Sequence, residues 1–224
     1  MFQTGDWAFV LNNADTLGRG LLITIGLTVT SLSLGFLVGF PAGALEVYGD
    51  GLLQRAVSGA GVVLRGTPIV VIMLVLFFVV SISQSAFVTA TVGLGLRSAA
   101  YQSQIFRGAL QSVDDGQMEA ARSIGMGKLQ AIRRVIVPQA LRRSMPGFQN
   151  EFTIVLKDTS IAFAIGLAEL LTQGYNLFTQ SGRSTAVLEV FLVISALYFV
   201  LTFLTNRGLD RLSDHYAIPS GENT

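Results

Sequence analysis

The chain has 224 residues, of which 51% are hydrophobic and only 13% are charged, and its formal net charge is +1. A soluble domain typically carries about a quarter charged residues, so this composition favours a multi-span membrane protein of one domain. The near-zero net charge gives no basis for nucleic-acid binding, and the absence of cysteine excludes disulfides and thiol chemistry. No cluster of side chains suggests a metal site.

Five apolar segments are predicted to cross the membrane as helices, since about 20 residues are needed to cover the hydrocarbon core. Gly66-Thr67-Pro68 interrupts the second segment, because proline removes a backbone donor and kinks a helix. Such a break lines a transport path in some transporters and is a simple packing kink in other proteins. In the first segment, the spacing of Gly35, Gly39 and Gly43 predicts close packing against another helix. The segments are residues 20–47, 57–82, 87–110, 148–171 and 185–207.

The third and fourth segments contain polar side chains, which are costly in a membrane unless they face a cavity, a partner or one another. Tyr101 and Gln104 in the third segment, with Glu151 and Ser160 in the fourth, are predicted to line a substrate path. Packing is the alternative for Tyr101 and Gln104, and neutralisation of a helix end is the alternative for Glu151. Asp158 lies two helical turns beyond Glu151 on a similar face, and there the helix-end role is favoured.

Glu169 is a further candidate near the end of the fourth segment. It either extends the polar lining or lies in water at the outer boundary.

A polar and basic loop separates the third and fourth segments. A short helix is predicted over residues 116–124, and Gly125 can adopt the left-handed conformation that ends a helix. A second helix is predicted to end at Pro138. The pattern is equally typical of an amphipathic helix on the membrane surface and of a docking element for a partner. The apolar side chains at helical spacing are Met118, Ala121, Ile124, Leu129, Ile132 and Val135.

The basic residues predict the orientation, because arginine and lysine are enriched on the cytoplasmic side of membrane proteins. Placing the N-terminus outside leaves only Arg19 and Arg183 in outer loops. The long loop and the C-terminus are then cytoplasmic, and the chain is a multi-pass protein of the cell membrane.

Several motifs of the loop and its surroundings resemble one transporter family. Glu119-Ala120-Ala121, followed by Gly125 and by Val135-Ile136-Val137-Pro138, resembles the EAA loop of ATP-binding-cassette (ABC) importer permeases. The usual ending of that loop is Ile-x-Leu-Pro, so the departure here keeps the apolar character. Over about residues 17–212 the chain resembles the polar amino-acid uptake branch, with histidine-, glutamine- and arginine-type permeases. The further matching segments are residues 65–68, 100–101, 105–108, 111–113, 116–117, 138–142, 150–152 and 157–160.

This resemblance implies a single all-α permease domain over residues 1–224 with the type I ABC importer fold, in which residues 111–147 form a cytoplasmic coupling loop. Glu119, Ala120, Ala121 and Gly125 are implied to contact an ATPase dimer. That dimer would bind ATP and Mg, since this chain has no phosphate-binding glycine-rich loop and no cofactor or catalytic residue of its own is expected. A second permease chain, identical or homologous, and an external substrate-binding protein are the other implied partners.

The implied substrate is a polar amino acid. Many permeases of this branch carry glutamate where this chain has Gln104. A neutral amide cannot pair with a cationic side chain, which argues against a strictly cationic substrate.

Two other functions are compatible with the residues alone. In an ion-coupled secondary transporter or channel subunit, Glu151 and Asp158 would relay ions and the loop would be only an amphipathic anchor. In a membrane scaffold without transport activity, the loop would bind a partner, but polar residues at mid-depth would not be needed.

Overall fold

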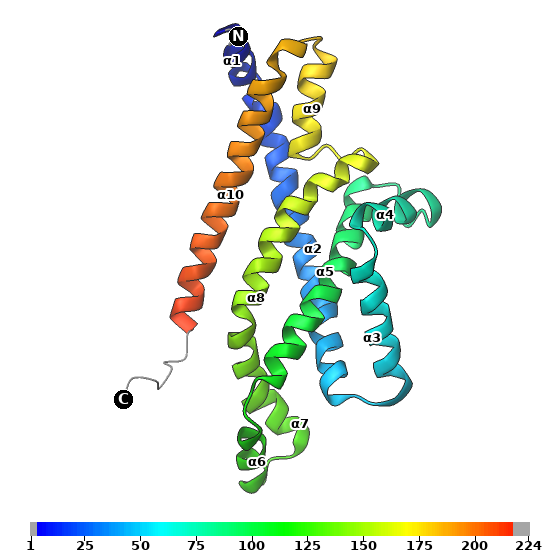
Figure 1. The fold of residues 1–224 in the computed structure, drawn as a ribbon, viewed down its shortest axis with the longest axis vertical. Helices are drawn as coiled ribbons and strands as arrows, with labels where there is room; N and C mark the ends of the chain where they lie inside the picture. Colours follow the sequence, from blue (N-terminus) through cyan, green and yellow to red (C-terminus); the bar gives the residue numbers. More distant parts are fainter. Residues whose placement is uncertain (1–3, 217–224) are drawn as a thin grey trace.

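The computed structural model describes residues 4–216, which form an elongated helical molecule (Figure 1). The predicted locations of residues 1 and 224 lie outside these residues. Helices α6 (Asp115–Ser123) and α7 (Lys128–Ala131) of the predicted coupling loop lie at one end of the molecule, and α1 (Thr4–Asn12) lies at the other (Figure 1). The α-helices are α1 (Thr4–Asn12), α2 (Ala14–Tyr48), α3 (Gly51–Gly66), α4 (Ile69–Leu74), α5 (Ala86–Gln111), α6 (Asp115–Ser123), α7 (Lys128–Ala131), α8 (Val137–Asp158), α9 (Leu170–Gln180) and α10 (Val187–Tyr216). The π-helices are η1 (Val75–Val79) and η2 (Ile132–Ile136), and the 3-10 helices are η3 (Thr159–Ile165) and η4 (Ser184–Ala186).

Helices α2 and α5 pack against each other through the glycines of α2. A Cβ atom on Gly39 would lie 2.6 Å from the carbonyl oxygen of Ala99, and one on Gly43 would lie 2.6 Å from that of Ser103. No side chain fits at such distances, so the small residues allow the two backbones to approach. The close packing predicted from the glycine spacing is confirmed.

The second predicted span is sharply bent rather than straight. Helix α3 ends at Gly66, and the α4–η1 segment that follows is turned by 105°. The bend lies at Thr67 and Pro68, where both residues have extended backbone torsions and Pro68 supplies no N–H donor. The interruption predicted at Gly66-Thr67-Pro68 is present, and the bounds of 57–82 are corrected: the two helical pieces begin earlier, at Gly51, and end at Val79.

The prediction that Pro138 ends a helix is wrong. Helical structure continues from α7 through η2 into α8, and Pro138 lies in the first turn of α8. Proline is tolerated in a first turn, and the wider π-turn immediately before it changes the hydrogen-bond pattern that its ring would disturb. Helix α8 consequently starts at Val137, in the polar loop, instead of near residue 148.

The fourth predicted span also ends earlier than residue 171. Helix α8 ends at Asp158, and η3 leads to Gly166, which has a φ of +75°. This left-handed glycine redirects the chain before α9 begins. Ala162 and Ile165 of η3 pack with Met73 and Leu94 in one of the apolar cores.

Within the described residues, α2 and the segment Ser184–Arg211 are long and apolar enough to span a membrane, and the bent α3–η1 pair is a third candidate. Helices α5 and α8 are also long, with 26 and 22 residues, but α5 buries polar side chains such as Ser98, Gln102 and Ser103. For α5, this agrees with the expectation that polar side chains of the third segment face a cavity, a partner or one another. The number of membrane crossings stays a prediction.

Candidate substrate cavity and coupling loop

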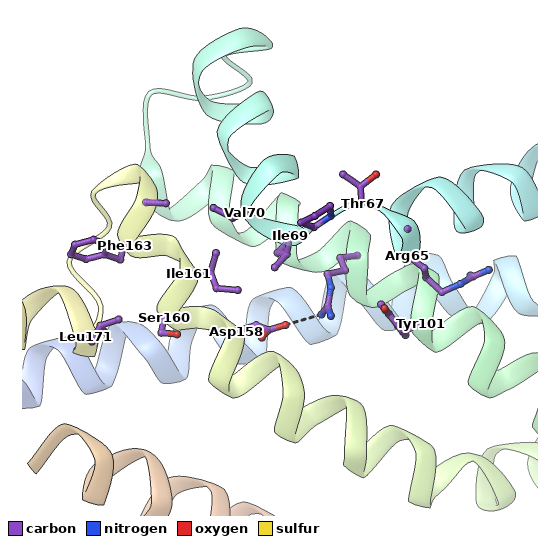
Figure 2. Close-up of a pocket in the computed structure, with 14 residues that line it drawn as sticks. Arg65, Thr67, Ile69, Val70, Tyr101, Asp158, Ser160, Ile161, Phe163 and Leu171 are labelled. Carbon is purple, nitrogen blue, oxygen red and sulfur yellow. Dashed lines mark hydrogen bonds and ion pairs between the residues drawn. The ribbon is translucent and has the colours of Figure 1, made fainter. Parts of the chain in front are cut away.

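A cavity of about 730 Å³ lies where the bend between α3 and α4 meets α5 and the end of α8 (Figure 2). The bend supplies backbone and small side chains, while η3 closes the opposite wall with apolar groups. The lining residues are Arg65, Gly66, Thr67, Pro68, Ile69, Val70, Arg97, Tyr101, Asp158, Ser160, Ile161, Phe163, Ala164 and Leu171.

An ion pair crosses the middle of this cavity. The Nη1 atom of Arg97 on α5 lies 2.8 Å from Oδ2 of Asp158 at the end of α8 (Figure 2). Both side chains are largely shielded, with 17% and 23% of their surfaces exposed. The guanidinium carbon of Arg97 also lies 4.8 Å from the ring centroid of Tyr101, a cation–π distance. Two contacts therefore fix the position of the Arg97 guanidinium.

Arg65 lies at the rim of the cavity. Its Nη1 donates a hydrogen bond of 2.8 Å to the carbonyl oxygen of Ala100, and Figure 2 shows its guanidinium directed away from Asp158. This bond joins the last turn of α3 to α5. The remaining N–H groups of Arg65 are not used in hydrogen bonds to other described residues.

The structure separates the four residues predicted to line the substrate path. Tyr101 and Ser160 line the cavity, but Gln104 and Glu151 do not. The Nε2 atom of Gln104 donates to both carboxylate oxygens of Glu46, at 3.1 and 2.9 Å, and Arg107 lies 3.2 Å from the same carboxylate. Gln104 thus joins α5 to the end of α2, as in the alternative of a buried amide bonding a neighbouring helix.

Glu151 is buried in the packing of α8, with 2% of its surface exposed. Its Oε1 atom has no hydrogen-bond partner, although Ser98 and Arg97 of α5 are its neighbours. Glu169 is fully buried and does not line the cavity, so it neither extends the polar lining nor lies in water. It accepts hydrogen bonds from the N–H groups of Leu171 and Thr172 and from the Tyr198 hydroxyl, and so caps α9.

Of the charged residues that line the cavity, Arg97 and Arg65 were not predicted to have a role. Both lie inside or beside apolar segments, where the basic-residue pattern is uninformative about orientation. The available signal was the cost of placing a charge in an apolar helix, which by itself points to a buried partner or a polar cavity.

The predicted coupling loop folds as the helices α6 and α7, joined by a turn at Gly125. The side chain of Asp114 accepts a 2.7 Å hydrogen bond from the N–H of Gly116 and caps α6. Gly125 has a φ of +88°, and the next residue, Met126, donates its N–H to the Ala121 carbonyl oxygen at 3.1 Å. The helix predicted to end at Gly125 is α6, whose last residue is Ser123, and Gly125 follows in the left-handed conformation.

The loop exposes part of its proposed contact surface. Glu119 and Ala120 are exposed, whereas Ala121 is buried against the rest of the loop. Ile124 and Leu129, on either side of the Gly125 turn, are 76% and 78% exposed. Large apolar side chains this exposed at the tip of a polar loop are suited to burial by a partner.

The sequence of the whole core matches a known family. Residues 31–214 match the binding-protein-dependent transport system inner membrane component. The chain belongs to this family. It is 33% identical over 208 residues to the probable amino-acid permease protein YxeN of Bacillus subtilis (strain 168), with 90% of this chain and 92% of that protein covered. It is 32% identical over 212 residues to the glutamine transport system permease protein GlnP of Escherichia coli (strain K12), with 92% and 95% covered.

Solved structures show the same fold. A crystal structure of an amino acid ABC transporter with histidines superposes with a TM-score of 0.85 at 30% identity, covering 96% of this chain and 100% of that chain. The MetNI methionine ABC transporter, in an inward-facing conformation, gives a TM-score of 0.79 at 22% identity, covering 92% and 99%. The resemblance inferred from the loop is confirmed. The chain is a membrane-embedded permease with the type I ABC importer fold, and it is a transport component rather than an enzyme.

Proposed function

We propose that this permease carries amino acids through the cavity at the Arg97–Asp158 pair, driven by a separate ATPase. The observation that carries the proposal is the cavity itself, which places the Arg97–Asp158 ion pair and the Tyr101 ring together between three helical segments. A zwitterionic amino acid has one carboxylate and one ammonium group, so Arg97 can donate hydrogen bonds to the substrate carboxylate and Asp158 can accept them from the ammonium group. The amino-acid transport named for its relatives supports this substrate class.

The coupling loop is the site proposed for the ATPase dimer. Glu119, Ala120, Ala121 and Gly125 form the helix and turn, and the exposed Ile124 and Leu129 add apolar surface at its tip. ATP and Mg would be bound by the ATPase, and nucleotide binding would bias the permease between inward-facing and outward-facing states. The other proposed partners are a second permease chain and an external binding protein that delivers the amino acid to the side opposite the loop.

Uptake by the reconstituted transporter tests the proposed path. The permease, its ATPase and its binding protein are placed in proteoliposomes, and ATP-dependent uptake of labelled amino acids is measured. Ser160→Leu introduces a bulky side chain into the cavity wall and should strongly reduce uptake. Ser33→Leu is the matched control, because Ser33 is exposed on α2 and lies outside this cavity. Full uptake by a well-assembled Ser160→Leu transporter would refute the path.

A further inference from the structure

We infer that the cavity discriminates amino acids by charge, favouring acidic over neutral and neutral over basic ones, and that Arg97 is the residue that sets this order. The inference rests on the proposed function and names the substrate class of the same cavity. It follows from the number and pairing of the charges that line the cavity.

The lining carries two cations and one anion. Asp158 is already paired with Arg97 at 2.8 Å, whereas Arg65 forms no ion pair with any described residue. An acidic amino acid brings two carboxylates and one ammonium group, which complements this set. A basic amino acid brings a second cation to a cavity whose only lining carboxylate is occupied, and a shielded position strengthens that repulsion.

Two charged groups lie near the cavity without lining it. Lys157 is exposed to solvent next to Asp158. Glu151 is buried about two helical turns before Asp158 on α8 and is a neighbour of Arg97, but it is not among the residues that a ligand in the cavity would contact. The charged side chains available for direct contact with a ligand are therefore Arg97, Arg65 and Asp158.

Arg97 is better placed than Arg65 to recognise a side-chain carboxylate. The guanidinium of Arg97 is held between the Tyr101 ring and the Asp158 carboxylate, both of which line the cavity, while that of Arg65 donates to the Ala100 carbonyl. A guanidinium has five N–H donors, so Arg97 can keep its bond to Asp158 and still donate to a bound carboxylate.

Equilibrium binding to the permease–ATPase complex tests the inference without the filter of the binding protein. The purified complex in lipid nanodiscs is titrated with radiolabelled glutamate, glutamine and arginine. Wild type should bind glutamate most tightly and arginine most weakly. Arg97→Gln should weaken glutamate binding about ten- to a hundred-fold, as expected for the loss of a hydrogen bond to a charged group, and should strengthen arginine binding by freeing Asp158.

The opposite change in relative affinity is expected for Asp158→Asn, because this substitution removes the anion and leaves Arg97 without its ion-pair partner. The ratio of glutamate to arginine affinity should rise in this variant. Arg207→Gln is the matched control, since Arg207 is an exposed arginine on α10 outside the cavity, and its affinity order should equal that of wild type. Arg97→Lys, which keeps the charge, should retain the preference for glutamate over arginine.

The outcomes separate this inference from the proposed function. If the wild-type complex binds these amino acids but Arg97→Gln and Asp158→Asn leave their affinity ratios unchanged, the charge discrimination is refuted and the transport path stands. The same holds if wild type binds arginine more tightly than glutamate. If the wild-type complex binds none of the three amino acids, both the inference and the proposed path are refuted.

Discussion

Gln104 joins two helices, because its amide donates to the Glu46 carboxylate and so connects α5 with α2. From the sequence, its position three residues after Tyr101 predicted a place on the substrate path. Glu46 is 58 residues away along the chain, so no local pattern could have revealed this partner.

Replacing Gln104 therefore distinguishes a role in helix packing from a role in substrate selectivity. Gln104→Glu removes the donor and places a second carboxylate against Glu46, which should lower the free energy of unfolding by about 1–3 kcal/mol. The order of amino-acid affinities should not change, because residue 104 lies outside the cavity. Thermal unfolding and competitive binding of the purified complex measure the two effects. A shift toward basic amino acids at unchanged stability would return Gln104 to the substrate path.

Glu169 connects α9 to α10 in the same way. Glu169→Ala should cost about 1–3 kcal/mol, because the N–H groups at the start of α9 and the Tyr198 hydroxyl lose their buried acceptor. Asp50→Ala is a matched control: Asp50 precedes α3 but makes no side-chain capping bond and is exposed. Thermal unfolding of both variants should show a loss for Glu169→Ala alone, and equal losses would contradict the capping role.

Helices α2 and α5 pack closely against each other, and their contact depends on glycines, which have no side chain. Gly39→Ala should destabilise the protein by about 1–3 kcal/mol, since its Cβ would overlap the Ala99 carbonyl oxygen. Gly18→Ala, in the same helix but with no atom within 4 Å of its Cβ, should be neutral or slightly stabilising because alanine favours helix. Thermal unfolding distinguishes them, and equal stability of the two variants would be incompatible with this packing.

The turn between α6 and α7 is the element proposed to couple ATP hydrolysis to transport. Gly125→Val forces a β-branched residue into a φ of +88° and should abolish transport-stimulated ATP hydrolysis while membrane insertion persists. Gly127→Val is the control, because Gly127 has a φ of −65° and open space around it. Normal substrate-stimulated hydrolysis in Gly125→Val would rule out the coupling role.

The helix boundaries show where the sequence alone was sufficient to predict the structure. The third segment, predicted over residues 87–110, is α5 (Ala86–Gln111), because an apolar run with clear polar flanks fixes both ends. The fourth was misplaced because Gly166 and the 3-10 turns before it depend on packing of Ala162 and Ile165 against other helices. In the cavity, Tyr101 and Ser160 were found from polarity alone, while Arg97 required knowledge of its partner 61 residues away.

At the scale of the whole molecule, the proposed orientation places α1 outside and the coupling loop in the cytoplasm. The chain lacks cysteine, so single cysteines can be introduced at Asn12 and Gln130, both exposed. An impermeant thiol reagent added to intact cells should label position 12 and leave position 130 unlabelled until the membrane is opened. Labelling of position 130 from outside would invert the topology.

The continuity of α7, η2 and α8 has a mechanical consequence. From Lys128 beside the loop tip to Asp158 in the cavity, the backbone is continuously helical through the π-helix η2 and past Pro146, with a contour length of about 46 Å at about 1.5 Å per residue. If one end of a segment of about this length is held and the segment moves as one body, a tilt of about 10° moves the other end by about 8 Å. That arc is longer than the 2.8 Å separating Asp158 from Arg97. A small swing of the loop would thus act as a lever that parts the two charges.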